Sequence, residues 1–425
     1  MQIEIHGLGS SGEGVGVLDG YVVFVDGALP GEVVNVRLVE RGARHGRAEL
    51  VSIEKASSDR VQPPCGLFGR CGGCQLMHLK YEAQLVVKRQ RVVDALERIG
   101  KLDGSRVCPC VASPVSLHYR NKIQMPVRDG RLGLYAKNSH DLVEVETCAI
   151  HCSLGEQVLN NVRAMLPFGL RHVLIKSAVH TNQALVVFVS REKPTVALRD
   201  TAQQLMAQNP CIRGVVHNLH SGPENVILGR EYTTLAGNGF VHEELCGLTF
   251  KVSPASFFQV NPAQAEQLYA KALEFAGLTG DETVLDAYCG VGTLSLLFAR
   301  ETGRVVGVEC VKEAIDDARE NARCNGIGNV EFVCAEAEQF IRKCPKIDVV
   351  LLNPPRKGCE ETMLAGIGRL KPKRVVYISC DPATLARDLG RLVGLGYKLE
   401  AVQPFDMFPQ TAHVETVVVM TCLNA

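Results

Sequence analysis

The chain has 425 residues, with 46 lysines and arginines balanced by 46 aspartates and glutamates. This length allows two or three domains with separate cores, and the balanced charge excludes a protein that attracts nucleic acid through one global basic field. No uncharged apolar run approaches the roughly 18 residues of a membrane span, and no secretory signal is visible. We therefore expect a cytoplasmic protein whose 17 cysteines are reduced and serve metal binding, catalysis or packing.

Residues 1–57 have the pattern of an all-β domain. Short alternating runs at Tyr21–Val25, Glu32–Leu38 and Arg47–Ile53 are separated by turns rich in Gly, Pro and Asp. Strands of this kind suit a small OB-like barrel. Segment Arg37–Arg47 is basic, which predicts either an RNA-facing hairpin or an ordinary solvated face.

A glycine-rich loop with three close cysteines comes next. Cys65, Cys71 and Cys74 have the spacing C-x5-C-x2-C, so their thiolates can chelate one metal centre while the glycines let the backbone wrap it. The candidates for a fourth ligand lie in the segment VETCAIHC and are Cys148, Cys152 and His151. We favour Cys148. Thiolate-only sites take iron–sulfur clusters or zinc, and the lack of two close cysteine pairs favours a cluster.

Residues 58–255 are expected to form a central α+β domain that contains this loop. A helix is predicted over Leu79–Leu102 from the spacing of its apolar residues. Stretch His118–Lys137 then combines cations with two interleaved rings, Tyr119 and Tyr135. It is the best local candidate for contacts with RNA phosphates and bases, and an exposed sheet face is the alternative. Its cations are Arg120, Lys122, Arg128, Arg131 and Lys137. The other elements expected in this domain are helices near Glu156–Met165 and Thr195–Gln208 and a strand near Leu185–Ser190.

Residues 256–425 are expected to form a doubly wound α/β sheet, because strands and helices alternate regularly from Thr283 onward. The predicted strands are Thr283–Asp286, Val305–Glu309, Val330–Cys334, Val349–Asn353, Arg374–Ser379 and Val414–Met420. Ligands collect at the carboxyl ends of the strands in this architecture, so polar groups at these ends are candidates for a site.

The segment VLDAYCGVGTLSL reads as a buried strand, a tight turn and the start of a helix. Gly290 and Gly292 let the backbone turn and approach a ligand closely. The next strand ends in Glu309, whose carboxylate can accept hydrogen bonds from two ribose hydroxyls. A nicotinamide dehydrogenase has a similar turn. The form D-x-x-C-G-x-G-T resembles instead the S-adenosylmethionine site of class I methyltransferases.

Three further polar groups stand at strand ends. Asn353 opens the motif Asn-Pro-Pro-Arg, in which Arg356 replaces the aromatic residue that marks methylation of exocyclic amino groups. Cys380 leaves a central strand before a helix that begins with proline, so it is a candidate nucleophile whose pKa the helix N-terminus should lower. Glu415 opens the last strand and is either a base or a solvated carboxylate.

These groups suit one reaction. Carbon 5 of uracil is too weak a nucleophile to take a methyl group directly, but addition of a thiolate to carbon 6 produces an enolate that is nucleophilic at carbon 5. A base must afterwards remove the carbon-5 proton so that the thiolate can leave. The chain has a candidate sulfonium site, a cysteine and a carboxylate for these steps.

The chain resembles the bacterial RNA uracil-5-methyltransferases, most closely the iron–sulfur 23S ribosomal RNA branch with an N-terminal TRAM domain. The resemblance rests on GEGVGVLDGYVVFVDGALPGE, the C-x5-C-x2-C-Q loop, YRNKIQ, SFFQVN, DAYCGVGTLSL, NPPRKG, SCDPATLARD and DMFPQTAHVE. It implies a TRAM barrel and a C-terminal Rossmann-like methyltransferase domain. It also implies a monomer that acts on RNA, with a transfer RNA as the alternative to 23S ribosomal RNA.

The resemblance also implies roles for single residues. Cys380 corresponds to the nucleophile and Glu415 to the base. The implied contacts to S-adenosylmethionine are Gln259, Tyr288, Glu309 and Asn353, and the implied ligands of a 4Fe–4S cluster are Cys65, Cys71, Cys74 and Cys148. The family usually has Asp where this chain has Asn353, so a proton-transfer role is excluded there while a hydrogen bond is not. The competing functions are amino-group methylation through the Asn-Pro-Pro-Arg motif and RNA binding without catalysis.

Overall fold

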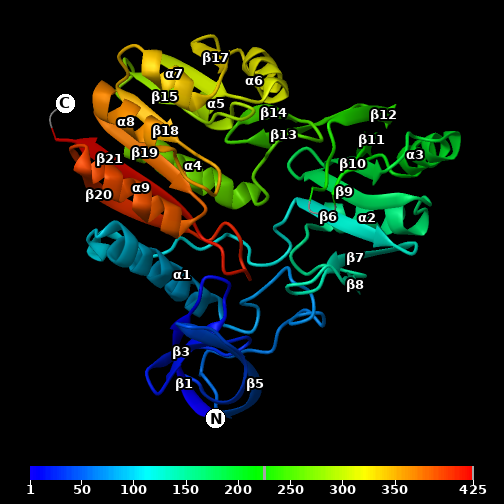
Figure 1. The fold of residues 1–425 in the computed structure, drawn as a ribbon. Coiled ribbons are helices and arrows are strands. Elements are labelled where there is room, and N and C mark those ends of the chain that lie inside the picture. The colour runs from blue at the N-terminus through cyan, green and yellow to red at the C-terminus, as the bar shows by residue number, and fades with distance from the viewer. Residues whose placement is uncertain (224–225, 424–425) are drawn as a thin grey trace.

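The computed structural model describes residues 1–223 and 226–423. It contains an N-terminal barrel, a central sheet and a C-terminal sheet, and each of them forms one lobe of the molecule (Figure 1). Within the described residues, no helix has both the length and the apolar character that crossing a bilayer requires.

The N-terminal lobe is a closed five-stranded barrel with strand order β1-β2-β3-β5-β4. Its strands are β1 (Gln2–Leu8), β2 (Gly14–Leu18), β3 (Tyr21–Val25), β4 (Val33–Arg41) and β5 (His45–Lys55). Alternate apolar residues such as Ile3, Val23 and Val34 point inward and form its core. The predicted OB-like barrel is therefore confirmed.

The central lobe is a mixed sheet with strand order β12-β11-β10-β9-β6-β7-β8. Its strands are β6 (Lys122–Arg128), β7 (Arg131–Tyr135), β8 (Leu142–Glu144), β9 (Leu170–Ala178), β10 (Gln183–Ser190), β11 (Ile212–Leu219) and β12 (Glu231–Gly237). Helices α2 (Ser153–Ala164) and α3 (Val196–Gln208) share one apolar core with one face of this sheet. The predicted α+β character is confirmed.

Two segments of the central region pack on the C-terminal lobe. Helix α1 (Tyr81–Ala95) continues through a π-helical turn, Leu96–Gly100, and buries Val92 and Leu96 in the core that also contains helix α9 (Pro382–Gly394). The hairpin of β13 (Val241–Leu245) and β14 (Leu248–Val252) buries its apolar side chains against the opposite face. The C-terminal sheet is therefore partly covered by chain that precedes it by a long distance in sequence (Figure 1).

The C-terminal sheet has strand order β17-β16-β15-β18-β19-β21-β20. Its strands are β15 (Thr283–Asp286), β16 (Arg304–Glu309), β17 (Val330–Cys334), β18 (Val349–Leu352), β19 (Arg374–Ser379), β20 (Tyr397–Phe405) and β21 (Glu415–Cys422). Its remaining helices are α4 (Pro262–Ala276), α5 (Thr293–Ala299), α6 (Lys312–Cys324), α7 (Ala337–Lys343) and α8 (Glu361–Leu370). Helices cover both faces, which confirms the predicted doubly wound class.

Strand β20 is absent from the sequence-based prediction. It lies at the edge of the sheet and carries Lys398, Glu400, Gln403 and Pro404, so its pattern is too polar to be recognised as a buried strand. Strand β21 runs antiparallel to β19 and β20 and lies between them. This reversal brings the beginning of β21 to the edge at which the parallel strands end.

Candidate active site

The glycine turn after β15 has the geometry expected of a close ligand-binding turn. Gly290 and Gly292 have φ of 53° and 82°, in the left-handed region that favours glycine. A Cβ on Gly292 would lie 2.8 Å from the Phe332 ring, so no larger residue fits. The Gly290 amide donates to Glu309 Oε2 at 3.3 Å, which holds the predicted ribose-binding carboxylate against the turn.

The strand order explains why three of the predicted cofactor residues converge. Strand β15 lies between β16 and β18 in parallel register, at the point where the order of the strands reverses. Tyr288 follows β15, Glu309 ends β16 and Asn353 follows β18, so all three lie at one edge. The Tyr288 hydroxyl donates to Glu338 Oε1 at 2.8 Å, which fixes the ring beside the turn.

Asp286, at the end of β15, was not among the predicted site residues although it belongs to the same motif. It is buried and accepts a hydrogen bond from Ser295 Oγ at 2.7 Å. The pKa of Asp286 is raised to about 6, chiefly by burial and also by the nearby Glu309 carboxylate, while the hydrogen bond from Ser295 acts to lower it. The Asp286 carboxyl group thus stabilises the glycine turn by linking the end of β15 to α5.

Gln259 lies in the segment before α4 and is 5% exposed. Its carbonyl accepts from Asn121 Nδ2 at 3.2 Å, and its side chain hydrogen-bonds with Tyr269, which also lies near Glu415. Two residues further on, Asn261 Nδ2 donates to Met407 O at 3.2 Å. Gln259 is therefore near the loop that leads to Glu415.

Sheet register brings Cys380 and Glu415 together. In the antiparallel pair of β19 and β21, Ser379 is opposite Thr416, so the residue after β19 lies beside the first residue of β21. Cys380 is half-buried and Glu415 is 4% exposed. A thiol and a carboxyl that are 35 positions apart in the sequence thus face the same edge as the glycine turn.

Burial dominates the electrostatics of this pair. It raises the pKa of Glu415 to about 8, while the Arg356 guanidinium acts to lower it. Burial, and next the Glu415 carboxylate, raise the pKa of Cys380, so the predicted lowering by the helix N-terminus is wrong. The amides at the start of α9 are bound by its own cap, because Asp381 accepts hydrogen bonds from Ala383 N at 3.0 Å and Thr384 N at 2.9 Å.

Arg356 is the residue that opposes these shifts. Its guanidinium hydrogen-bonds with Cys380 and acts to lower the pKa of this thiol and of Glu415. Thr384 Oγ1 donates to the Arg356 carbonyl at 3.1 Å, which ties the Asn-Pro-Pro-Arg loop to α9. From the sequence, Arg356 is notable only because it replaces an aromatic residue. The structure places it beside the candidate nucleophile, Cys380.

The four predicted cluster ligands line one cavity of about 370 Å³. Burial raises the pKa of Cys74 to about 12, and the thiols of Cys148, Cys71 and Cys65 contribute in that order, so all four lie near one another. Neither of the rival ligands, Cys152 and His151, is among the described residues that line this cavity. Cys152 caps α2 by accepting from Gly155 N at 3.4 Å, and His151 Nδ1 lies 2.7 Å from Glu156 Oε1. Geometry therefore favours Cys148 as the fourth member.

Zinc ions and iron–sulfur clusters place different demands on the spacing of their thiolate ligands. In the part of the chain that the structure describes, no three His, Cys, Asp or Glu side chains are gathered tightly enough to hold a single metal ion. Four thiolates on one zinc ion must all approach to about 2.3 Å from it. The thiolates of an iron–sulfur cluster bind different iron atoms and enclose a larger volume.

The same cavity extends to the edge of the C-terminal sheet at which Cys380 and Glu415 lie. Arg356, Phe408, Thr411 and His413 form part of its wall. Burial and the nearby Arg356 and Arg91 cations lower the pKa of His413 to about 4, so this imidazole is neutral at pH 7. The cysteine loop and the segment before Glu415 thus share one cavity wall.

Comparison with known proteins decides the family. Residues 240–422 match the family model of tRNA (uracil-5-)-methyltransferases, and residues 1–51 match the TRAM domain. An RNA methyltransferase of Clostridium tetani described as uncharacterised is 40% identical over 98% of this chain and 95% of its own. A similarly described protein of Halalkalibacterium halodurans is 40% identical over 100% of this chain and 97% of its own.

The chain belongs to the RNA (uracil-5-)-methyltransferase family. A solved structure agrees with this assignment: the tRNA (uracil-54, C5)-methyltransferase of Pyrococcus abyssi in complex with S-adenosyl-L-homocysteine has a TM-score of 0.79. It is 26% identical, and the match covers 99% of this chain and 100% of that one. S-adenosylhomocysteine is what S-adenosylmethionine becomes once its methyl group has been transferred, so the methyl donor expected from the glycine turn is supported.

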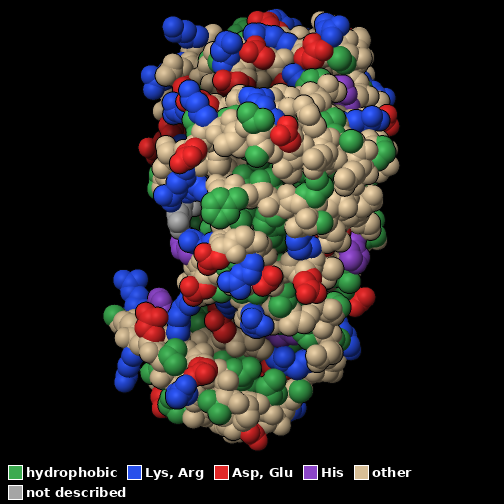
Figure 2. All heavy atoms as spheres, turned by 90° about the vertical axis from the view of Figure 1, so that its right-hand side faces the viewer, with side chains coloured by type: hydrophobic (Ala, Val, Ile, Leu, Met, Phe, Trp, Pro, Cys, Tyr) green, Lys and Arg blue, Asp and Glu red, His purple; other side chains and the backbone are tan. Residues whose placement is uncertain are grey.

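The predicted RNA-binding stretch of the methyltransferase is only partly available to RNA. Tyr119 is 4% exposed and its hydroxyl donates to Pro409 O at 3.0 Å, so the prediction that this ring stacks on a base is wrong. Lys137 Nζ pairs with Asp26 Oδ1 at 2.8 Å, and burial lowers the pKa of Lys122. On the face drawn in Figure 2, cations and acids are interspersed, and there is no single basic field.

Proposed function

We propose that this methyltransferase transfers the methyl group of S-adenosylmethionine to carbon 5 of a specific uridine in RNA. The observation that carries the proposal is the juxtaposition of Cys380, Glu415 and Arg356 at the carboxyl edge of the sheet, next to the glycine turn. Cys380 acts as the nucleophile and Glu415 as the base. Arg356 favours the anionic form of each.

The steps follow from the chemistry of uracil. The Cys380 thiolate adds to carbon 6, and the resulting enolate attacks the methyl group of the sulfonium through carbon 5. The Glu415 carboxylate then accepts the carbon-5 proton. The carbon 5–carbon 6 double bond re-forms, and the carbon–sulfur bond breaks with its electron pair returning to Cys380.

The four candidate cofactor residues hold S-adenosylmethionine at this edge. Glu309 accepts from the ribose hydroxyls, Tyr288 contacts the adenine, and Gln259 and Asn353 hydrogen-bond to the donor. Asn353 cannot act as a base. The target uridine must leave its stack to reach Cys380, and Phe257, which is 68% exposed, is available to hold the extruded state.

Cys65, Cys71, Cys74 and Cys148 hold a 4Fe–4S cluster in this proposal. The support is the cavity that the four thiols share, which neither Cys152 nor His151 lines among the described residues. Methyl transfer to uracil moves no net electrons, so the cluster's contribution is structural. The cluster would cross-link the cysteine loop to the segment around Cys148.

Ribosomal RNA of the 23S type is the substrate that the sequence resemblance favours. Transfer RNA is the second candidate, favoured by what the Pyrococcus abyssi neighbour acts on. Amino-group methylation is disfavoured because it needs no thiol, whereas Arg356 of the Asn-Pro-Pro-Arg motif contacts Cys380. We assign RNA binding to residues 1–57, the cluster to residues 58–255 and methyl transfer to residues 256–425 of a cytoplasmic, monomeric enzyme.

Mass spectrometry of RNA from a strain that lacks the gene tests the proposal. Purified 23S ribosomal RNA and transfer RNA are digested separately and compared with RNA from the parent strain. We expect one of them to lack a 5-methyluridine, which returns with the wild-type gene and not with Cys380→Ala. Unchanged 5-methyluridine at every position in both RNAs contradicts the proposal.

A further inference from the structure

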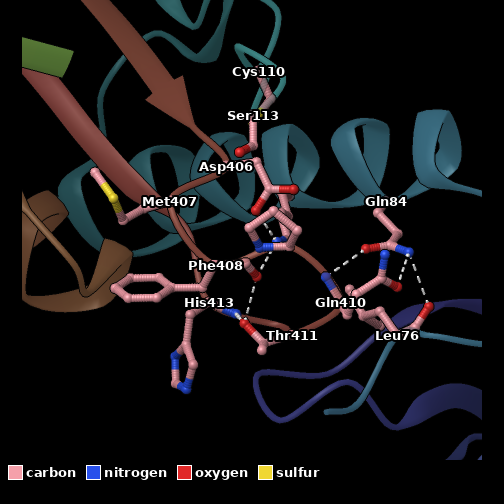
Figure 3. Close-up of polar contacts among 12 residues, drawn as sticks. Leu76, Gln84, Cys110, Ser113, Asp406, Met407, Phe408, Gln410, Thr411 and His413 are labelled. Carbon is pink, nitrogen blue, oxygen red and sulfur yellow. Dashed lines mark hydrogen bonds and ion pairs between the residues drawn. The ribbon is translucent and has the colours of Figure 1, made fainter. Parts of the chain in front are cut away.

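The loop Asp406–His413, here called the β20–β21 loop, ends two residues before Glu415. It packs against helix α1 and against the chain that follows the cysteine loop, both of which are more than 300 positions away in the sequence (Figure 3). A loop between two strands is usually mobile. This one is instead held by buried polar contacts along its whole length.

Gln410 is the centre of this arrangement. It has a φ of 69°, in the left-handed region that a residue with a side chain adopts only when its surroundings hold it there. Gln84 on α1 supplies this support in both directions. Gln410 N donates to Gln84 Oε1 at 3.1 Å, and Gln84 Nε2 donates to Gln410 Oε1 at 3.0 Å (Figure 3). The two residues are 1% and 6% exposed, for Gln84 and Gln410 respectively, so water competes little for these bonds.

The cysteine loop is attached to the same point. Gln75 and Leu76 directly follow Cys74, and their amides donate to the Gln410 carbonyl at 3.0 and 2.9 Å. Gln84 Nε2 also donates to Leu76 O at 3.1 Å and lies 2.8 Å from Leu79 O. One glutamine side chain thus contacts both the segment after the cysteines and the segment before Glu415.

We propose that Gln84 and Gln410 are positioning residues for Glu415, and that through them the place of this carboxylate depends on the cysteine loop. This inference rests on the proposed function. Glu415 is the first residue of β21, so the path of the preceding loop decides where its side chain enters the site. Proton removal requires the carboxylate within hydrogen-bond reach of carbon 5, and a displacement of about 1 Å costs on the order of 100-fold in rate.

The effect of losing Gln84 should be local. Lys88 Nζ still binds Asp406 Oδ1 at 2.5 Å, and Tyr119 still binds Pro409 O at 3.0 Å. These contacts keep the β20–β21 loop attached to the protein. The substitution removes the partner of Gln410 N and Oε1 and of the Leu76 and Leu79 carbonyls, so the left-handed conformation relaxes and the end of the loop shifts. Methyl transfer depends on Cys380, which lies between β19 and α9, away from the contacts of Gln84.

The test compares Gln84→Ala with Gln90→Ala, a substitution of the same type on an exposed face of the same helix, where Gln90 Nε2 binds only Asp94 Oδ1 among the described contacts. The probe is the RNA that lacks 5-methyluridine in the deletion strain, labelled with tritium at carbon 5 of uridine. Transfer of labelled methyl groups to RNA, free and protein-bound, reports the first half of the reaction. Release of tritium to water reports the step performed by Glu415.

For Gln84→Ala we expect tritium release to slow by about tenfold or more, methyl transfer to change less than about threefold, and methylated RNA to accumulate on the protein. Gln90→Ala should match wild type in both. A parallel fall of the two rates, or no change in either, overturns the inference. Gln84→Glu provides a milder variant, because it keeps the acceptor for Gln410 N and should lie between wild type and Gln84→Ala.

A double-mutant cycle with Gln410→Ala tests whether the two glutamines act together. We expect the double variant to release tritium no more slowly than Gln84→Ala alone, because Gln84→Ala already removes both hydrogen bonds between the two residues, whereas Gln410→Ala removes only the one to Gln410 Oε1. Multiplication of the two losses contradicts a shared role. The controls separate the two proposals: wild-type protein that releases no tritium refutes the proposed function, whereas normal wild-type release with unaffected Gln84→Ala refutes only this inference.

Discussion

Burial of Glu415 makes the stability of the methyltransferase depend on pH in a defined direction. The pKa of this carboxyl is about 8 in the folded protein, against 4.5 for an ordinary glutamate. Because the folded state favours the protonated form, the associated stability is complete below pH 4.5 and is lost as the pH rises through 8. A change of pKa of this size corresponds to about 5 kcal/mol of lost stability above pH 8.

Glu415→Gln removes this titration while it keeps the size and polarity of the side chain. The two proteins should therefore differ least near pH 5, and the variant should be more stable by several degrees in its unfolding midpoint at pH 9. Thermal unfolding at matched ionic strength measures the difference, with Glu301→Gln at an exposed position as the control for one lost charge. A difference between Glu415→Gln and wild type that is the same at pH 5 and pH 9 refutes the reasoning.

Other expectations follow from the same structure. Protein purified without air should contain iron and sulfide, which Cys148→Ser should lose and Cys152→Ser should keep; equimolar zinc without iron would contradict the cluster. Lys88→Met should cost about 3–5 kcal/mol in urea unfolding, because it leaves the Asp406 carboxylate buried without its cation, and a second substitution, Asp406→Leu, should restore much of the loss. Arg131→Ala should reduce the salt dependence of RNA binding by about one unit of slope, and an unchanged slope would mean that this side chain only faces solvent.

The sequence predicted those features that depend on short stretches of chain. Most parallel strands of the C-terminal sheet have a largely apolar pattern, and the residue that follows is a candidate site residue in several cases, such as Asn353 and Cys380. The glycine turn and the C-x5-C-x2-C loop are likewise complete within a few residues. The cavity shared by Cys74 and Cys148 agrees with a pairing that sequence alone left open between neighbouring candidates.

Features that depend on distant contacts were not predictable in this way. Burial raises the pKa of Cys380, and Glu415 raises it as well because the antiparallel register of β21 brings this carboxylate beside the thiol, which no local pattern reveals. Tyr119 is turned inward by the loop that contains Pro409. Gln84 and Gln410 are ordinary polar residues in the sequence, and their role is visible only where the two segments meet.

The central claim is a covalent intermediate on Cys380, and RNA that contains 5-fluorouridine tests it most directly. Fluorine cannot leave carbon 5 as a cation, so addition and methylation can proceed but the final elimination cannot. With S-adenosylmethionine present, wild-type protein should form an adduct with its fluorinated target RNA that survives denaturing gel electrophoresis, and Cys380→Ala should form none. Failure of the wild type to form this adduct on RNA that it otherwise methylates, or an equal adduct with Cys380→Ala, would contradict the account.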